Sequence, residues 1–185
     1  MLSKARRVTG VIVTAAFFQV LWYLLVSNAG KPLSIWIAVA TAVVMAAAVS
    51  LFTETPGRSL AFLVLALVLG GLMDTGLTMA GCIAPVRTYL PYPVPPAWLL
   101  GLWVGFAGFA RISLRYLCGR PLVQFAAGFF GGPAAYFGGV KLDAVTVHSN
   151  VLLGYGLLAV SWGVACIVLF SVSCKLHEQP VPEEE

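Results

Sequence analysis

Charged residues are scarce in this sequence of 185 residues: 10% are Asp, Glu, Lys or Arg, whereas 60% are hydrophobic, and the mean hydropathy is +0.94. One soluble core could not bury so much apolar surface, so a soluble globular protein is excluded. At about 20 apolar residues per membrane span, the chain has room for about six spans and none for a soluble catalytic domain. The composition therefore predicts an all-α membrane protein, a bundle of about six transmembrane helices.

Histidine and cysteine are also few, and their spacing does not suit metal ligands. No CxxC pair occurs among the two histidines and four cysteines, which are His148, His177, Cys82, Cys118, Cys166 and Cys174. We therefore expect no metal site and no cofactor, and we expect all four cysteines to be small buried apolar residues. The motifs GxSxG, Walker loop and HExxH are missing, and no GxGxxG follows a strand, so an enzyme is the less favoured class.

Six apolar stretches are long enough to be membrane spans. We expect one polytopic domain over residues 1–173, with spans at 8–26, 33–52, 60–82, 97–117, 122–140 and 151–173. The first stretch could instead be a signal peptide, but its apolar core is longer than the usual ~7–15 residues, which favours an uncleaved span. Residues 174–185 end in three glutamates and are expected to form a disordered, acidic cytoplasmic tail.

Lysines and arginines are unevenly distributed between the two ends of these spans. With the N-terminus inside, three fall outside (Lys31, Arg87, Lys141) and eight lie at or near the cytoplasm: Lys4, Arg6, Arg7, Arg58, Arg111, Arg115, Arg120 and Lys175. The positive-inside rule then predicts that both termini are cytoplasmic. The net charge of +4 is expected to reflect contact with membrane lipids and not nucleic-acid binding.

Two arginines one helical turn apart, Arg111 and Arg115, occur near the end of the fourth predicted span. Arg115 can extend to the interface, and Arg111 either does the same or faces inward. Facing inward, the two guanidinium groups would suit a phosphate, a carboxylate or an anionic headgroup, and Arg120 would complete a basic rim.

Asp74 is the only acidic residue within a predicted span. It lies about 12 Å above the level of Arg111, which is too far for a direct salt bridge. Two interpretations stay open. Asp74 is either neutral or capped by Thr75, Thr78 or a loop amide, or it is an intramembrane proton or cation group reached through water.

The fifth predicted span is rich in small residues and contains Gly131-Gly132-Pro133. The proline predicts a short helix that is broken at this point, with freed carbonyls beside Tyr136. Close packing against another helix would explain the small residues at Gly128, Gly132, Ala135 and Gly139. We expect a ligand pocket near Asp74, Trp103, Pro133 and Tyr136.

Five ordered segments carry a resemblance to a known family: FQVLW (18–22), GGLMDTGL (70–77), PAWLLGLWVGFA (96–107), SLRYLCGRP (113–121) and GFFGGPAAYFGGVKLDAV (128–145). Together they resemble the bacterial membrane family catalogued as domain of unknown function 2878. Family members usually carry an Asn-His pair where this chain has Ala110-Arg111-Ile112, so the resemblance implies no role for Arg111. The pattern is matched at Asp74, Trp98, Trp103, Arg115, Arg120, Pro133 and Tyr136.

The resemblance implies a multi-pass protein of the bacterial inner membrane, with relatives near genes for fatty-acid modification. Three functions are compatible with it. A module that binds or transports a small solute or lipid, with a membrane or cytoplasmic protein partner, is favoured. An accessory protein or enzyme of membrane-lipid modification would hold a headgroup at Arg115 and Arg120. A structural scaffold is the third.

Overall fold

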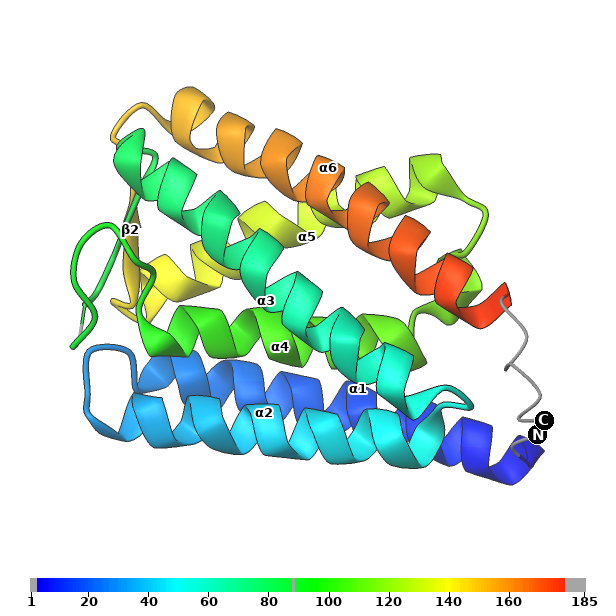
Figure 1. The fold of residues 1–185 in the computed structure, drawn as a ribbon. Coiled ribbons are helices and arrows are strands. Elements are labelled where there is room, and N and C mark those ends of the chain that lie inside the picture. The colour runs from blue at the N-terminus through cyan, green and yellow to red at the C-terminus, as the bar shows by residue number, and fades with distance from the viewer. Residues whose placement is uncertain (1–2, 88, 179–185) are drawn as a thin grey trace.

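The computed structural model describes residues 3–87 and 89–178, which form six α-helices, one 3-10 helix and two short strands (Figure 1). Strands β1 (Ile83–Pro85) and β2 (Val145–Val147) pair antiparallel, a feature that the sequence analysis did not predict. The predicted helical fold class is confirmed. The helices are α1 (Lys4–Ser27), α2 (Leu33–Phe52), α3 (Pro56–Met79), α4 (Ala97–Ile112), η1 (Arg115–Leu117), α5 (Pro121–Lys141) and α6 (Val151–Glu178).

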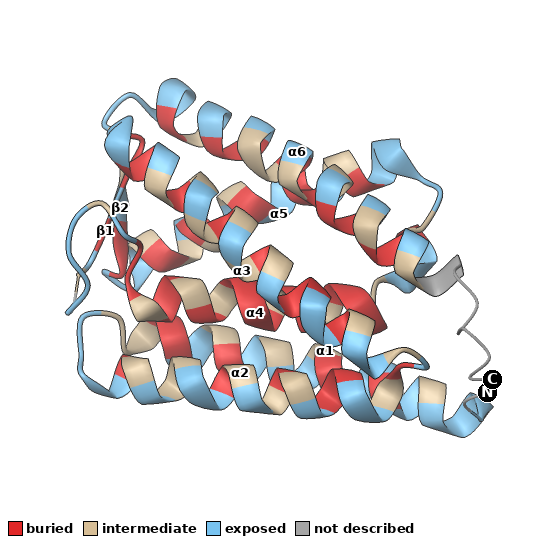
Figure 2. Ribbon diagram, viewed as in Figure 1, coloured by how far each residue is buried: buried red, intermediate tan, exposed pale blue. Residues whose placement is uncertain are grey.

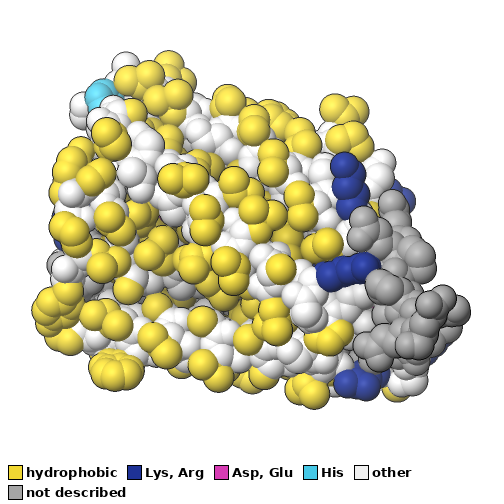
Figure 3. Space-filling model, viewed as in Figure 1, with side chains coloured by type: hydrophobic (Ala, Val, Ile, Leu, Met, Phe, Trp, Pro, Cys, Tyr) yellow, Lys and Arg dark blue, Asp and Glu magenta, His cyan; other side chains and the backbone are white. Residues whose placement is uncertain are grey.

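Four of these helices are long and apolar enough to cross a membrane: α1, α2, α3 and residues 151–176 of α6. Helix α5 is long enough but less apolar. Helix α4 has 16 residues, so it is about 24 Å long and shorter than the ~30 Å hydrocarbon core of a bilayer. Hydrophobic side chains cover much of the surface (Figure 3). These features indicate a membrane protein.

Helix α4 lies at the centre of the bundle (Figure 2). Most of its residues are buried, and it contacts α1, α2, α3 and α6. Helix α5 packs mainly against α6 instead. A Cβ atom at Gly128 would collide with the carbonyl oxygen of Trp162, and one at Gly132 would collide with its indole ring. These glycines therefore allow the close helix packing that the small residues predicted.

The two strands close one end of the bundle, which we call the strand end (Figure 1). Helix α3 stops at Met79, before the predicted end at residue 82, because Gly81 adopts a φ of 69° and the Cys82 N–H donates to the Leu77 carbonyl. This glycine cap is a Schellman motif. The chain passes from it directly into β1.

Two further predicted boundaries are wrong at the other end, which we call the η1 end. Helix α4 stops at Ile112 and not at 117, where the Ser113 hydroxyl donates to the Val11 carbonyl of α1 and the chain turns into η1. Helix α6 continues to Glu178, so residues 174–178 of the predicted tail are helical. The remainder of that tail, 179–185, lies outside the described residues.

The predicted break in the fifth helix is not observed. Helix α5 is one helix through Gly131-Gly132-Pro133. The proline lacks an N–H and so removes one backbone hydrogen bond, whereas the bonds on either side maintain the helix in apolar surroundings.

Cys118 and Cys174 form a disulfide that joins the chain after η1 to the end of α6. The prediction that all four cysteines are simply small buried apolar residues is wrong for this pair. It holds for Cys82 and Cys166, which are free and buried. The bridge spans 56 positions in the sequence, and such connectivity cannot be deduced from spacing alone.

We expect Gly128→Val to lower the stability of the protein by about 1–3 kcal/mol, because the added atoms would push α5 away from the Trp162 backbone. Gly156→Val in α6 is the matched control, since a Cβ there meets no atom within 4 Å. Thermal unfolding in detergent, followed by circular dichroism, compares the two variants. Equal unfolding temperatures would contradict the close α5–α6 contact.

Candidate functional site

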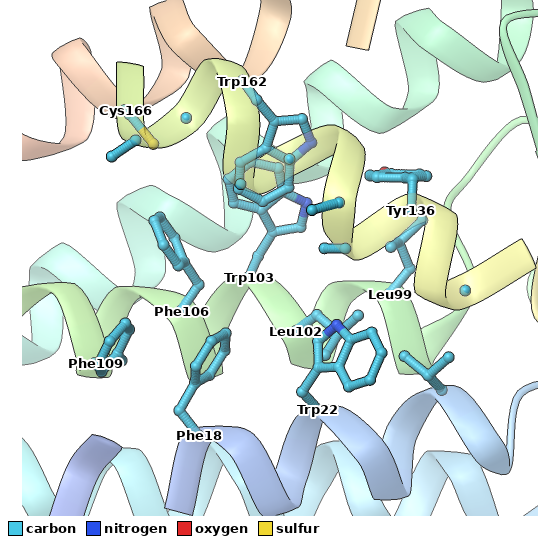
Figure 4. A pocket seen from close by; sticks show the side chains of 18 of the residues that line it. Phe18, Trp22, Leu99, Leu102, Trp103, Phe106, Phe109, Tyr136, Trp162 and Cys166 are labelled. Atoms are coloured by element: carbon cyan, nitrogen blue, oxygen red, sulfur yellow. The ribbon is translucent and has the colours of Figure 1, made fainter. Parts of the chain in front are cut away.

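A cavity of about 470 Å³ lies between α1, α4, α5 and α6 (Figure 4). We call it the aromatic cavity. Its walls are almost entirely apolar, and its volume is within the range of about 300–1,000 Å³ that is usual for small-molecule sites. Eight aromatic side chains of α1, α4 and α6 contribute to the walls: Phe18, Trp22, Trp98, Trp103, Phe106, Phe109, Trp162 and Phe170.

Stacked tryptophans form one wall of the aromatic cavity. The rings of Trp103 and Trp162 are 4.5 Å apart at an angle of 9°, and Phe106 meets Trp162 edge-on at 5.6 Å (Figure 4). Gly70 of α3 makes room for this arrangement, because a Cβ atom there would collide with the Trp103 ring. Since such aromatic pairs have preferred geometries, the wall has a defined shape.

Asp74 is fully buried in α3 and accepts two hydrogen bonds from residues of the cavity wall. The Trp103 Nε1–H donates to Oδ2 at 2.6 Å, and the Tyr136 hydroxyl donates to Oδ1 at 2.7 Å. This network joins α3, α4 and α5. Neither threonine suggested from sequence caps it: the Thr75 hydroxyl donates to the Gly71 carbonyl, and the Thr78 hydroxyl is buried without a hydrogen bond to any described residue.

The structure thus brings together three of the four residues expected at a ligand pocket. Trp103 and Tyr136 line the aromatic cavity, and Asp74 lies behind them as their common acceptor. Pro133 is in α5 but is not part of the cavity wall.

Among the cavity residues that escaped the sequence analysis, two carry polar groups. Gln19 lines the cavity from the middle of α1, and the signal for it was a glutamine inside an apolar run. Trp162 is in the middle of α6 rather than at an interface, where tryptophans of membrane helices concentrate. Its Nε1–H is buried and makes no hydrogen bond within the described residues, although the Tyr136 hydroxyl lies close to it.

The aromatic cavity opens between α1 and α5. Ala127, Gly131 and Ala134 of α5 line it and are nevertheless exposed, as is Gln19 of α1. The three α5 residues are spaced by four and three positions and so lie on one face of the helix. The opening is therefore on the side of the bundle, between two helices.

The arginines expected to form a basic rim are divided. Arg111 and Arg115 line a second, smaller pocket at the η1 end, together with Arg7 of α1. Arg120 is exposed and does not line this pocket. Within residues 3–87 and 89–178, no group of three His, Cys, Asp or Glu side chains could hold a metal ion.

The sequence profile of a family described as "protein of unknown function (DUF2878)" matches residues 11–168. The chain belongs to this family. No curated protein and no solved structure matches the chain. The resemblance seen in the motifs is thereby confirmed. The region shared with the DUF2878 family includes Asp74, Trp103, Tyr136 and Trp162, whereas Arg7 precedes it.

In this DUF2878 protein we expect Asp74→Leu to lower stability by about 2–4 kcal/mol, since it leaves two buried donors without an acceptor. Asp74→Asn is the matched variant and should cost much less. Its carbonyl oxygen can accept from Trp103, and its amide can donate to the Tyr136 hydroxyl. Thermal unfolding in detergent measures both. If the leucine variant were as stable as the asparagine variant, the network would not hold the site together.

Proposed function

We propose that this protein binds an apolar, lipid-like molecule in the aromatic cavity. The observation that carries the proposal is the cavity itself, about 470 Å³ in volume, walled by aromatic side chains and open between α1 and α5. A polar solute would leave its hydrogen-bonding groups unmatched against such walls, at a cost for each group. An apolar chain has no such groups and gains from contact with the rings.

The few polar atoms of the cavity limit the ligand further. Gln19 is at the opening, and the Trp162 Nε1–H is a buried donor without a partner. A ligand with an apolar body and one acceptor oxygen would satisfy both features. The side opening allows such a molecule to enter from the bilayer core without crossing water.

The same arrangement favours binding over catalysis. Both carboxylate oxygens of Asp74 already accept hydrogen bonds from Trp103 and Tyr136, and Asp74 does not reach the cavity. We therefore assign Trp103 and Tyr136 to ligand contact and Asp74 to positioning them. Transport of the ligand across the membrane would require a second opening of the cavity. The alternatives to a binding function are an enzyme and a structural scaffold.

The membrane arrangement that we propose has six spans, with α4 and α5 completing the four longer helices, in the bacterial inner membrane. Lysine and arginine side chains gather at the η1 end, where α1 begins and α6 ends (Figure 3). By the positive-inside rule this end faces the cytoplasm. Disulfides such as Cys118–Cys174, which lies at this end, are rare in that compartment, so the two signals oppose each other. Membrane lipids are then the immediate partners of the exposed apolar faces.

Tryptophan fluorescence offers a direct test, because four of the five tryptophans line the cavity: Trp22, Trp98, Trp103 and Trp162. Trp36 is 72% exposed and is first removed as Trp36→Phe. We expect a brominated stearic acid to quench the remaining fluorescence of the detergent-solubilised protein in a saturable manner. Gly131→Leu should weaken this binding about tenfold by filling the opening.

Gly156→Leu is the matched control for that experiment. An added Cβ meets no atom within 4 Å at either glycine, but only Gly131 lines the cavity. We expect the control to bind the bromolipid like the parent protein. Quenching that is unsaturable, or equal in both leucine variants, would show that the aromatic cavity is not the binding site.

A further inference from the structure

A second pocket, of about 270 Å³, lies at the η1 end between the start of α1, the end of α2 and the end of α4. We call it the arginine pocket. Three arginines line it, Arg7, Arg111 and Arg115, and the rest of the wall is Thr53 and apolar side chains. The arginines come from distant parts of the sequence, so the fold itself concentrates positive charge at this place.

Arg111 is fully buried, and its charge is balanced by no ion pair with a described carboxylate. Its three bonds all go to neutral oxygens: Nε to Ser59 Oγ at 3.1 Å, Nη1 to the Ser173 carbonyl at 2.7 Å and Nη2 to Thr55 Oγ1 at 3.0 Å. A guanidinium group has five N–H donors, so two are left over. A buried cation without a counter-charge is costly, and an anion in the pocket would offset that cost.

The other two arginines add to this charge. Arg115 is exposed and lies near enough to Arg111 to repel it. Arg7 pairs with Glu54 at 3.1 Å, and both side chains of that pair are partly exposed. Among the described residues one carboxylate pairs with these three guanidinium groups, which leaves the pocket with an excess of positive charge.

We propose that the arginine pocket binds a phosphate group, held by Arg7, Arg111 and Arg115. Guanidinium groups present paired N–H donors that match the oxygens of a phosphate, and several arginines around one anion reinforce one another. The phosphate is either a free anion or the headgroup of a lipid, whose chains would lie along the exposed apolar side chains of Val8 and Ile12. This site is separate from the aromatic cavity and does not depend on the function proposed for it.

Binding is measured as the rise in unfolding temperature with ligand concentration, in a non-ionic detergent at low salt. The probes are inorganic phosphate, short-chain phosphatidic acid and, as a zwitterionic control, short-chain phosphatidylcholine. We expect Arg115→Ala and Arg7→Ala each to weaken phosphate-group binding about tenfold. Arg120→Ala is the matched control, because Arg120 is exposed at the same end but lies outside the pocket, and it should change binding less than about twofold.

Each outcome has a distinct meaning. Stabilisation by inorganic phosphate that is lost in Arg115→Ala identifies a site for free phosphate-type anions. Stabilisation by phosphatidic acid alone, lost in the same variant, identifies a lipid headgroup site. No stabilisation by either probe, or an equal loss in Arg120→Ala, overturns the proposal, because binding would then be absent or due to general surface charge. The unfolding temperatures without ligand confirm that each variant folds.

Discussion

The two hydrogen bonds to Asp74 join α3 to α4 and α5, two of the helices that line the aromatic cavity. Helix α5 packs mainly on α6, and α6 in turn packs on α3 and α4. Tyr136 of α5 and Trp103 of α4 donate to opposite oxygens of one buried carboxylate in α3. In a low-dielectric interior, hydrogen bonds to a carboxylate are strong, and an unmatched partner is costly. The spacing of α5 from α4, and hence the cavity between them, follows from this constraint.

Glycines determine where the helices pack closely against a tryptophan and where the aromatic cavity opens. The indole of Trp103 packs directly against the backbone at Gly70, and Trp162 packs against the backbone at Gly128 and Gly132. The two indole rings are also stacked on each other. Gly131 is a neighbour of Gly132 in sequence but faces the open space. One short glycine-rich segment therefore has two physical roles, close packing against α6 and the opening of the cavity.

The helices could be predicted from the sequence because each is an apolar run bounded by polar or helix-breaking residues, and α2 has the expected bounds of 33–52. The sequence predicted that Asp74, Trp103 and Tyr136 lie near one pocket. It did not predict the hydrogen bonds between them, because these depend on how each helix is rotated about its axis. The Cys118–Cys174 bridge, the strand pair and the role of Arg7 depend on contacts between distant segments. No local pattern encodes these contacts. The continuity of α5 through Pro133 also could not be predicted locally. The helix-breaking tendency of proline is outweighed there by apolar surroundings, in which the backbone must form its own hydrogen bonds.

Helix α1 separates the two proposed binding regions. Phe18, Gln19 and Trp22 face the aromatic cavity, whereas Arg7, Val8 and Ile12 face the arginine pocket about three turns nearer the η1 end. Helix α1 is held in place beside the arginine pocket: Gly10 packs against Phe52, and the Ser113 hydroxyl donates to the Val11 carbonyl. The two pockets share no lining residue. An apolar molecule in the cavity and a phosphate group at the arginines would therefore be bound side by side rather than in sequence.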